Sequence, residues 1–301
     1  MARREVDTLR IAHLSDLHLP LTQSAPVWSL MGKRALGWFN LKMLRGNTHR
    51  LDVFLALLAD LAEQSPDVVV ITGDLVNLAY DFEFAEVARL LEEAGLDPAR
   101  CVLVPGNHDR YTAGADRGAA FEKGMSDWLP PGLARRDGYP WLRKLGPICV
   151  LALDSAVWRG PARAAGRLAD GQLERLAGLL DGLDDSCHPV LAMHHPPIRL
   201  RGPALRDYRA GLSGFEGLFR VLGRRPATVL HGHLHRIGRS RRGAVEILGA
   251  PSASNDCGRS EDQAAYHLLT FSSRGLLSAQ ARRFWPGRVE VQDLPDEALL
   301  R

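Results

Sequence analysis

Five short blocks of the chain place aspartate, asparagine or histidine directly after a strand-like apolar run. These blocks are Ser15-Asp16-Leu17-His18, Gly73-Asp74, Gly106-Asn107-His108-Asp109, His194-His195-Pro196-Pro197 and His231-Gly232-His233-Leu234-His235. Carboxylate, amide and imidazole groups are ligands for hard or borderline divalent metals, and none of the blocks contains a cysteine. Because one ion would not need so many ligands, the pattern predicts two metal ions rather than one.

The spacing inside the blocks suits a shared cleft. In the Asp-x-His of residues 16–18 and the His-x-His of residues 233–235, positions i and i+2 of an extended segment point to the same side. Gly73 and Gly106 allow tight turns or a close backbone approach beside the ligands. Since ligands in open α/β sheets bind at the carboxyl ends of the strands, we expect the five blocks to converge there.

Strands and amphipathic helices that could position these blocks alternate along the first two thirds of the chain. The patterns predict strands at Leu9–Leu14, Asp67–Thr72, Cys101–Val104, Ile148–Leu153, Val190–Met193 and Thr228–Leu230, and helices over residues 49–64 (capped by Asn47 or Thr48), 84–94 (closed by Gly95) and 173–183 (capped by Asp170). Further strands are predicted at Val245–Leu248, Tyr266–Phe271, Leu277–Arg282 and Val289–Val291. We therefore expect one α/β domain with helices covering a sheet or a pair of sheets; a division near residue 185 is the alternative.

In this order, the five blocks resemble the calcineurin-like metallophosphoesterase superfamily. Its pattern is D-x-H, G-D, G-N-H-[DE], a histidine often followed by x-P, and G-H-x-H, and this chain matches it at every block across residues 16–235. The resemblance implies an αββα sandwich with two mixed β-sheets flanked by helices and a C-terminal portion that is mostly β. It also implies a single domain over residues 1–301, with a core at about 8–292.

The resemblance assigns a role to each block residue. Asp16, His18 and His235 would bind one metal, Asn107, His194 and His233 would bind the other, and Asp74 would bridge the two. His108 would assist the leaving group beside the phosphate, and Asp109 would orient His108 from behind. His195 is the alternative ligand to His194, which we prefer because the strand ends there.

The activity that the resemblance implies is metal-dependent phosphohydrolysis. A metal-bridging hydroxide would attack phosphorus in line and cleave a phosphodiester, phosphomonoester or pyrophosphate bond. The cofactors would be two divalent transition-metal ions, and this ligand set accepts Mn, Fe or Zn. The specific alternatives are a cyclic-nucleotide phosphodiesterase and a nucleotide–lipid pyrophosphatase of the UDP-diacylglucosamine type. A non-catalytic scaffold of the same fold is the alternative from another class.

Residues 20–46 separate the first ligand block from the first helix. They mix bulky apolar residues with Lys33, Arg34, Lys42 and Arg45. Such an insertion suits a lid for a lipid-linked substrate with a peripheral membrane contact, or a helical hairpin packed on the core. Arginines after the histidine blocks either draw an anionic substrate in or belong to solvated loops. They are Arg199, Arg201, Arg206, Arg209, Arg236, Arg239, Arg241 and Arg242.

Some residues have no motif context. His13, His49, His188 and His267 are expected to be ordinary histidines, and Arg110 either reaches the phosphate or faces solvent. The four cysteines (Cys101, Cys149, Cys187 and Cys257) lie far apart and are expected to be free thiols in a reducing compartment.

Composition restricts the partners and the location. The 301 residues are 46% hydrophobic and 24% charged, and the net charge of +3 is too weak to argue for nucleic acid. No signal-peptide pattern begins the sequence, and no apolar run approaches the ~18 residues of a membrane-spanning helix. We expect a cytoplasmic enzyme that acts on a phosphorylated small-molecule or lipid-linked substrate. The sequence indicates no protein partner.

Overall fold

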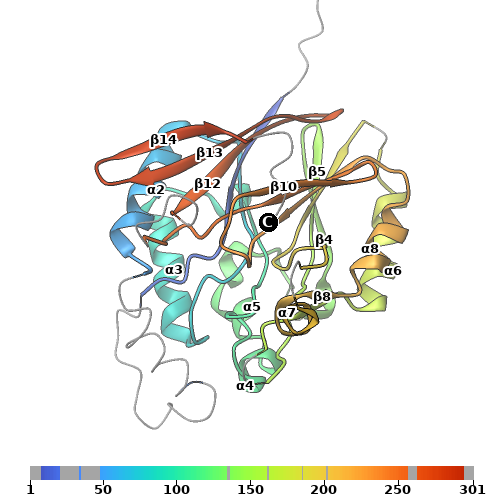
Figure 1. Ribbon diagram of the computed structural model, residues 1–301, viewed down its shortest axis with the longest axis horizontal. Coiled ribbons are helices and arrows are strands. Elements are labelled where there is room, and N and C mark those ends of the chain that lie inside the picture. The colour runs from blue at the N-terminus through green and yellow to red at the C-terminus, as the bar shows by residue number, and fades with distance from the viewer. Residues whose placement is uncertain are drawn as a thin grey trace, which may run out of the picture.

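In the computed structural model, two six-stranded β-sheets pack face to face with helices on both outer faces (Figure 1). The structure describes residues 8–20, 34, 48–133, 136–160, 163–184, 186–200, 203–256 and 263–294. This layering is the αββα sandwich, with two mixed sheets and a C-terminal portion of strands, that the sequence predicts.

The first sheet has the order β14-β13-β12-β1-β2-β3. Its strands are β1 (Leu9–Leu14), β2 (Val68–Ile71), β3 (Cys101–Leu103), β12 (Ala265–Ser272), β13 (Gly275–Trp285) and β14 (Arg288–Asp293). β1, β2 and β3 run parallel, so their carboxyl ends lie at one edge. The three C-terminal strands extend this sheet by antiparallel pairing, starting with β12 against β1.

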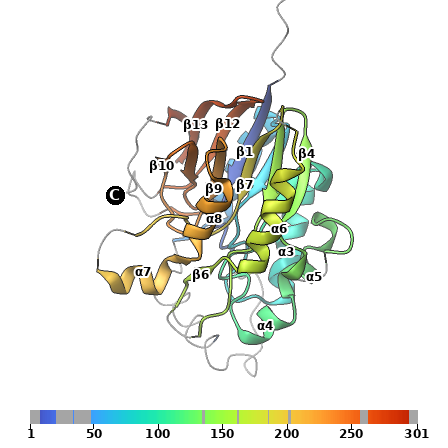
Figure 2. The ribbon, with the colours of Figure 1, turned by 90° about the vertical axis from the view of Figure 1, so that its right-hand side faces the viewer.

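The second sheet has the order β10-β11-β9-β7-β5-β4. Its strands are β4 (Trp141–Leu145), β5 (Ile148–Ala152), β7 (His188–Ala192), β9 (Ala227–His231), β10 (Gly238–Arg242) and β11 (Val245–Gly249), and a separate short pair joins β6 (Gly166–Arg167) to β8 (Leu212–Ser213). β5, β7, β9 and β11 are parallel neighbours, and the two outer strands are antiparallel. β7 and β9 are paired neighbours near the centre of this sheet (Figure 2).

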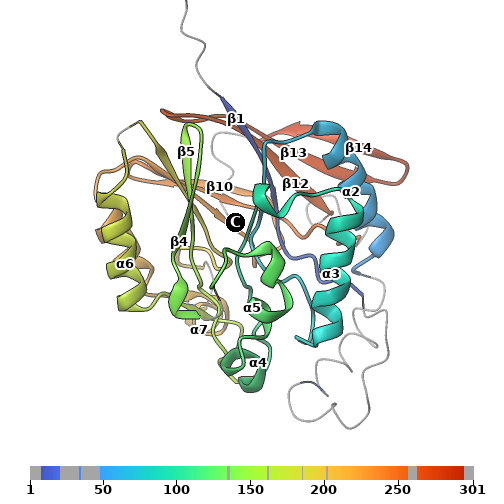
Figure 3. The same cartoon turned by 180° about the vertical axis from the view of Figure 1, so that it is seen from behind.

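Two helices cover the outer face of each sheet (Figure 3). α2 (Leu51–Gln64) and α3 (Asp81–Glu93) cover the first sheet, and α6 (Asp170–Asp181) and α8 (Phe215–Leu222), which Figure 2 shows together, cover the second. The shorter helices are α4 (Ala113–Arg117), α5 (Ala120–Gly124) and α7 (Ala204–Ala210), with 3₁₀ turns η2 (Pro98–Arg100), η3 (Ser126–Trp128) and η4 (Arg136–Gly138).

Strand alternation divides the apolar residues into two cores. In β7, Val190 and Ala192 join the large core between the sheets, while Leu191 faces the smaller core under α6 and α8. Because successive side chains of a strand point to opposite faces, a fully apolar strand fills both cores. The result is a rigid pair of sheets whose parallel strands end together at one edge.

The expected helix caps differ from the structure by a few residues. α2 begins after Arg50, whose side chain makes no capping hydrogen bond, rather than after Asn47 or Thr48. α6 begins at Asp170 itself, with Ala169 at the cap position. Gly95 does adopt a positive φ of 73° after α3, as a helix-ending glycine should. Of the segment 20–46, only Pro20 and Arg34 are among the described residues, so the lid prediction lies outside them.

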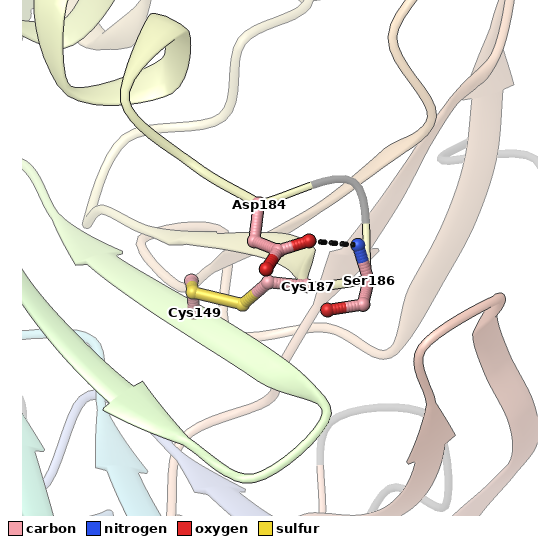
Figure 4. Close-up of a disulfide and its surroundings, with 4 residues drawn as sticks. All are labelled: Cys149, Asp184, Ser186 and Cys187. Atoms are coloured by element: carbon pink, nitrogen blue, oxygen red, sulfur yellow. Dashed lines mark hydrogen bonds between the residues drawn. A yellow bond between two sulfur atoms is a disulfide. The ribbon is translucent and has the colours of Figure 1, made fainter.

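The prediction that the cysteines are free thiols is wrong for two of them. Cys149 of β5 and Cys187, directly before β7, form a disulfide with a Cα–Cα distance of 5.9 Å (Figure 4). β5 and β7 are parallel neighbours, and this pairing brings residues 38 apart in the chain together. Asp184 accepts a hydrogen bond from the backbone N–H of Ser186 in the turn beside it. Cys101 is free and buried, and Cys257 lies outside the described residues.

Candidate metal centre

The carboxyl ends of β1, β2, β3, β7 and β9 meet at one edge of the two sheets, and each delivers a predicted site residue. The first sheet supplies Asp16, His18, Asp74, Asn107, His108 and Asp109, and the second supplies His194, His233 and His235. Side chains from both sheets therefore face one another across a single cluster. All of the predicted metal ligands come together in it.

One half of the cluster consists of Asp16, His18 and His235. The Nε2 of His235 lies 3.1 Å from Oδ1 of Asp16 and 3.2 Å from Nε2 of His18. The His18 Nε2 lies 3.8 Å from the same carboxylate oxygen. Three donor atoms thus surround one small volume, which is the arrangement that a cation requires.

The second half consists of Asn107, His194 and His233. Nε2 of His194 lies 3.2 Å from Oδ1 of Asn107 and 3.2 Å from Nδ1 of His233. Asp74 stands between the halves, because its Oδ2 is 3.3 Å from Nε2 of His194 and 3.6 Å from Nε2 of His18. This position between the two groups suits a bridging carboxylate.

The backbone of the site is locally strained. Asp16, His18, Asp74, His233 and His235 all have positive φ, between 42° and 72°. Side chains other than glycine rarely adopt this conformation, and its cost is kept where function or tight packing over-determines it. Five of the seven predicted ligands share it, so the turns after β1, β2 and β9 aim these side chains inward rather than continuing the strands.

Two glycines make room for the carboxylates. A Cβ on Gly106 would lie 2.2 Å from Oδ1 of Asp74, and a Cβ on Gly232 would lie 1.8 Å from Oγ of Ser15 and 2.4 Å from Oδ2 of Asp16. Neither distance leaves space for a methyl group. The glycines before Asn107 and His233 are therefore required by the close approach of chain to carboxylate.

Backbone carbonyls select the ring nitrogens that face the cluster. His194 donates from Nδ1 to the carbonyl of Thr72 at 2.7 Å, and His233 donates from Nε2 to the carbonyl of Ala210 at 3.0 Å. A carbonyl can only accept, so in the neutral form that binds a metal the lone pair lies on Nε2 of His194 and on Nδ1 of His233. These are the two atoms that lie 3.2 Å apart in the cluster. Such outer partners are how proteins orient histidine ligands.

His194 and His195 have different contacts in the structure. His195 donates from Nε2 to the carbonyl of Ala164 at 2.7 Å, and its Nδ1 lies 2.9 Å from Oγ of Ser155. Both of its ring nitrogens are engaged in the wall of the site. His194 instead faces Asn107, Asp74 and His233, as the position at the strand end suggests.

His108 lies beside the cluster, and its ring is held by a different group from the one expected. Its backbone N–H donates to Oδ1 of Asp74 at 2.6 Å, and its Nδ1 donates to the carbonyl of Asn77 at 2.8 Å. The carboxylate of Asp109 accepts three backbone N–H groups, from Gly106, Leu75 and Val76. Asp109 therefore fastens the turns that bear Asp74 and Asn107, whereas the Asn77 carbonyl orients the His108 ring.

Burial and close neighbouring charges shift the pKa values of several site residues. Burial alone would lower the pKa of His194, but the charge of Asp74 and the hydrogen bond to it raise that pKa to about 9. Burial would raise the pKa of Asp74, yet His194 and His108 hold it well below its ordinary value. Burial, reinforced by His194, lowers the pKa of His233 to about 3. Burial and the charge of Asp74 raise the pKa of Asp109 to about 8.

These residues fit a pair of divalent metal ions. Among the described residues, the buried Oδ1 of Asp16 and Nδ1 of His18 have no hydrogen-bond partner, and no lysine or arginine forms an ion pair with Asp16 or Asp74. Buried charge without a compensating cation is costly. The donors are oxygen and nitrogen only, which suits Mn, Fe or Zn without selecting one.

His49 is a site residue that the sequence did not reveal. Its ring centroid lies 4.8 Å from that of His18 and 5.9 Å from that of His235, and its Nδ1 lies 2.8 Å from Oγ of Ser254. Residues 48–50 pair with the loop at 254–256, which brings the ring to the centre. No local motif surrounds His49, and its only sequence signal is its place next to the 20–46 segment.

Both expectations for Arg110 are wrong. Its side chain is fully buried and binds Oε1 of Glu122 at 2.5 Å and Oδ2 of Asp154 at 2.8 Å. It neither reaches into the cluster nor faces solvent. His13, His188 and His267 are buried in the core, as ordinary histidines can be.

Comparisons with known proteins agree with this geometry. A family model described as calcineurin-like phosphoesterase matches residues 9–236, which include all five blocks. A protein named "Probable cyclic nucleotide phosphodiesterase syc0937_d" from Synechococcus sp. is 27% identical over 277 residues, which cover 91% of each chain. A "Probable cyclic nucleotide phosphodiesterase" from Rhodococcus erythropolis is 28% identical over 174 residues, 56% of this chain and 52% of the relative.

Solved structures share the fold. Purple acid phosphatase PPD1 from yellow lupin (Lupinus luteus) seeds superposes with a TM-score of 0.65 at 12% identity, covering 96% of this chain and 53% of the phosphatase. A dimetal phosphatase from Danio rerio superposes with a TM-score of 0.60 at 12% identity, covering 95% and 98%. At such low identity these likenesses concern the architecture alone.

Proposed function

Since the chain belongs to the calcineurin-like phosphoesterase family and is a hydrolase of phosphoester bonds, we propose that the converging strand ends are its catalytic centre. One divalent ion would bind to Asp16, His18 and His235, the other to Asn107, His194 and His233, with Asp74 shared. The single observation that supports this division is the position of Asp74 Oδ2, within 3.6 Å of a histidine nitrogen from each half.

When bound, the two ions would polarise phosphate oxygens and supply an activated water. The protein's own groups do the rest. Asp74 and Asp16 provide the negative charge that retains the ions, and the carbonyls of Thr72 and Ala210 keep the His194 and His233 rings aimed at them. No step needs a side chain that the described site lacks.

His108 is the proposed proton donor to the leaving group. Because its Nδ1 is bonded to the Asn77 carbonyl, any proton that it gives to a substrate passes through Nε2. Its ring lies 4.7 Å from that of His18 and stacks on Tyr111 at 5.3 Å, so it borders the proposed centre, where a leaving group would lie. A positioned donor of this kind contributes about 100- to 10,000-fold to a rate.

A phosphodiester is the substrate class that we propose, and a cyclic nucleotide is the first candidate. The support is the naming of two relatives as probable cyclic nucleotide phosphodiesterases. The nucleotide–lipid alternative depended on residues 20–46, which lie outside the described residues apart from Pro20 and Arg34. The metal would be a divalent transition-metal ion such as Mn, Fe or Zn, all of which accept nitrogen and oxygen donors.

The test of the substrate is a turnover comparison on the full chain loaded with Mn²⁺. The substrates are 3′,5′-cyclic AMP, 2′,3′-cyclic AMP, an aryl phosphomonoester and a nucleotide–lipid pyrophosphate. We expect the cyclic diesters to be hydrolysed with the highest kcat/KM. Preferential hydrolysis of the monoester or the pyrophosphate would overturn the substrate proposal while leaving the centre intact.

Neighbouring histidines provide a matched test of the ligand assignment. We expect His194→Asn to lose one of two bound metal equivalents, measured by elemental analysis of the folded protein. His195→Asn, one residue away and equally buried, should retain both. The reverse result would exchange the roles of the two histidines.

A further inference from the structure

The small net charge of the chain conceals a strong separation of charge. Residues 48–133 contain fifteen acidic and six basic residues, a net formal charge of −9. Residues 199–242 contain eleven arginines against Asp207 and Glu216, a net formal charge of +9. Asymmetry of this size between two regions is typical of proteins that bind a polyanionic surface.

The main helices of the acidic region, α2 and α3, lie on a different flank of the fold from α7 and α8 of the basic region. The acidic region includes α2, α3, β2 and β3 of the first sheet, and the basic region includes α7, α8, β9 and β10 of the second. In Figure 1, α2 and α3 lie on the left, while α8 lies on the right and α7 below the second sheet. Negative and positive formal charges are therefore concentrated on different sides of the molecule.

α7 presents apolar and cationic side chains together. Leu205 and Tyr208, one turn apart, are 54% and 57% exposed, and Arg206 and Arg209 are exposed on the same short helix. Asp207, the acid of α7, accepts a hydrogen bond from the backbone N–H of Leu200 at 3.2 Å and is only half-exposed. The outward surface of α7 is consequently apolar and positive.

This surface adjoins the metal centre. The carbonyl of Ala210, the last residue of α7, is the group that orients His233. The backbone N–H of Ala164 donates to the carbonyl of Arg209 at 2.8 Å, and the Arg163 guanidinium lies 3.9 Å above the Tyr208 ring. We call Arg163, Leu205, Arg206, Tyr208 and Arg209 the α7 surface.

We propose that the α7 surface docks the enzyme on an anionic phospholipid bilayer. Arginine guanidinium groups attract anionic headgroups, while leucine and tyrosine side chains insert at the boundary between headgroups and acyl chains. An exposed Leu205 gains nothing from a nucleic-acid backbone, which favours a membrane over a duplex as the polyanion. The acidic flank, repelled by the same charge, turns away from the bilayer and leaves the metal centre beside it.

Vesicle co-sedimentation of the full chain tests the proposal without any assay of turnover. The vesicles are phosphatidylcholine alone or an equal mixture of phosphatidylcholine and phosphatidylglycerol. We expect binding only to the mixture, weakened by salt. Arg206→Gln with Arg209→Gln should weaken it about thirtyfold, at about fivefold per arginine. Leu205→Ser with Tyr208→Ser should also reduce the bound fraction, with less effect on the salt dependence.

Matched variants test whether the effect is local. Arg89→Gln with Arg100→Gln removes the same charge from the acidic flank, and Leu277→Ser with Val291→Ser removes apolar side chains that are 57% and 51% exposed on the first sheet. Both controls should bind vesicles as the wild type does. The proposal is overturned if the wild type ignores the anionic vesicles, or if the α7 variants bind them equally well. It is also overturned if the α7 arginines are needed for a duplex oligonucleotide and not for vesicles.

Discussion

Two buried polar clusters lie on adjacent parts of this fold, and they are built on opposite plans. Around Arg110, a buried guanidinium is paired with the carboxylates of Glu122 and Asp154, so the protein itself supplies a cation beside these acids. At the metal centre, two carboxylates and several imidazoles converge without lysine or arginine among the described contacts. The first cluster therefore contains an arginine, and among the described contacts the second contains neither arginine nor lysine.

The difference separates a structural cluster from a binding site better than burial does, since both are buried. Each cluster has a buried atom without a hydrogen bond, Oδ1 of Asp16 and Nε of Arg110, but only the centre has positive φ at its predicted ligand positions, five of them. Such costs persist where the rest of the fold enforces them, and they cluster at functional sites. Removing a group from each cluster should therefore have different consequences, for activity at one and for stability at the other.

The largest effect is expected for Asp74→Asn, because it removes the shared carboxylate. We expect kcat on an aryl phosphodiester to fall by at least about 1,000-fold, since metal ions contribute several kcal/mol to phosphoryl transfer. The melting temperature of the metal-free protein should change little. Steady-state kinetics and thermal unfolding measure the two quantities. Wild-type turnover in this variant would contradict the bridging role.

The opposite outcome is expected for Arg110→Ala. Loss of the guanidinium leaves Glu122 and Asp154 buried without a partner, which costs about 3–5 kcal/mol of unfolding free energy. The folded fraction should still bind two metals and keep kcat within a few-fold of the wild type. Urea unfolding and metal analysis provide the readouts.

An exposed arginine is the control for that prediction. Arg89 forms surface ion pairs with Glu86 and Glu93, so Arg89→Ala should cost less than about 1 kcal/mol. If Arg110→Ala instead removed metal and left stability unchanged, the division between the two clusters would be mistaken.

The same contrast explains what could be predicted from sequence. The metal ligands follow strands in short motifs, so their order along the chain and the parallel topology suffice to bring them together. Arg110 follows Asn107 and His108 in the same block, yet it turns away because Glu122 and Asp154 lie behind it. Those partners are 12 and 44 residues distant and belong to no motif.

Long-range pairing also explains the other differences. His49 reaches the centre only because residues 48–50 pair with the loop at 254–256, and Cys149 meets Cys187 only because β5 and β7 are neighbours. Neither pairing has a local signature. The Asn77 carbonyl that orients His108 is a backbone group, so no residue type could indicate it. Strand order was the missing information for the disulfide, and the paths of the loops were missing for His49 and His108.

The pH dependence of the unfolding free energy extends the comparison to His188, a buried histidine that has a hydrogen-bond partner outside the metal centre. His188 lies 3.0 Å from Oγ1 of Thr228, and burial lowers its pKa to about 4. A histidine whose folded-state pKa lies below its unfolded value of ~6.5 stabilises the fold fully above that pH, and the contribution is lost as the pH falls towards 4. We expect a loss of about 3 kcal/mol over this window.

The measurement is the difference between wild type and His188→Gln in the metal-free state, where the other buried histidines contribute equally to both proteins. The variant should show a flatter pH dependence of unfolding free energy between pH 6.5 and 4, by about the amount above. Identical slopes would mean that His188 is protonated without penalty in the fold.

The smallest effect is expected for His49, which lies between the metal centre and the buried Ser254. Its ring packs on His18, and its Nδ1 lies within hydrogen-bonding distance of Ser254, close to Ser252, which donates to the Asp16 carbonyl. Groups behind a ligand typically change metal affinity by about 10- to 100-fold. His49→Phe preserves a ring against His18 and removes the hydrogen bond, so we expect about tenfold weaker binding of one metal, and a larger loss for His49→Ala.

Calorimetric titration should show that the other metal, at Asn107, His194 and His233, is unaffected. His188→Phe is the control, because it removes a comparable bond from a buried histidine far from the centre and should leave both affinities unchanged. If His49→Phe weakened the binding of both metals equally, the substitution would be acting on the whole fold and not on one metal site. Selective weakening would show that the hydrogen bond of His49 supports the metal site at Asp16, His18 and His235.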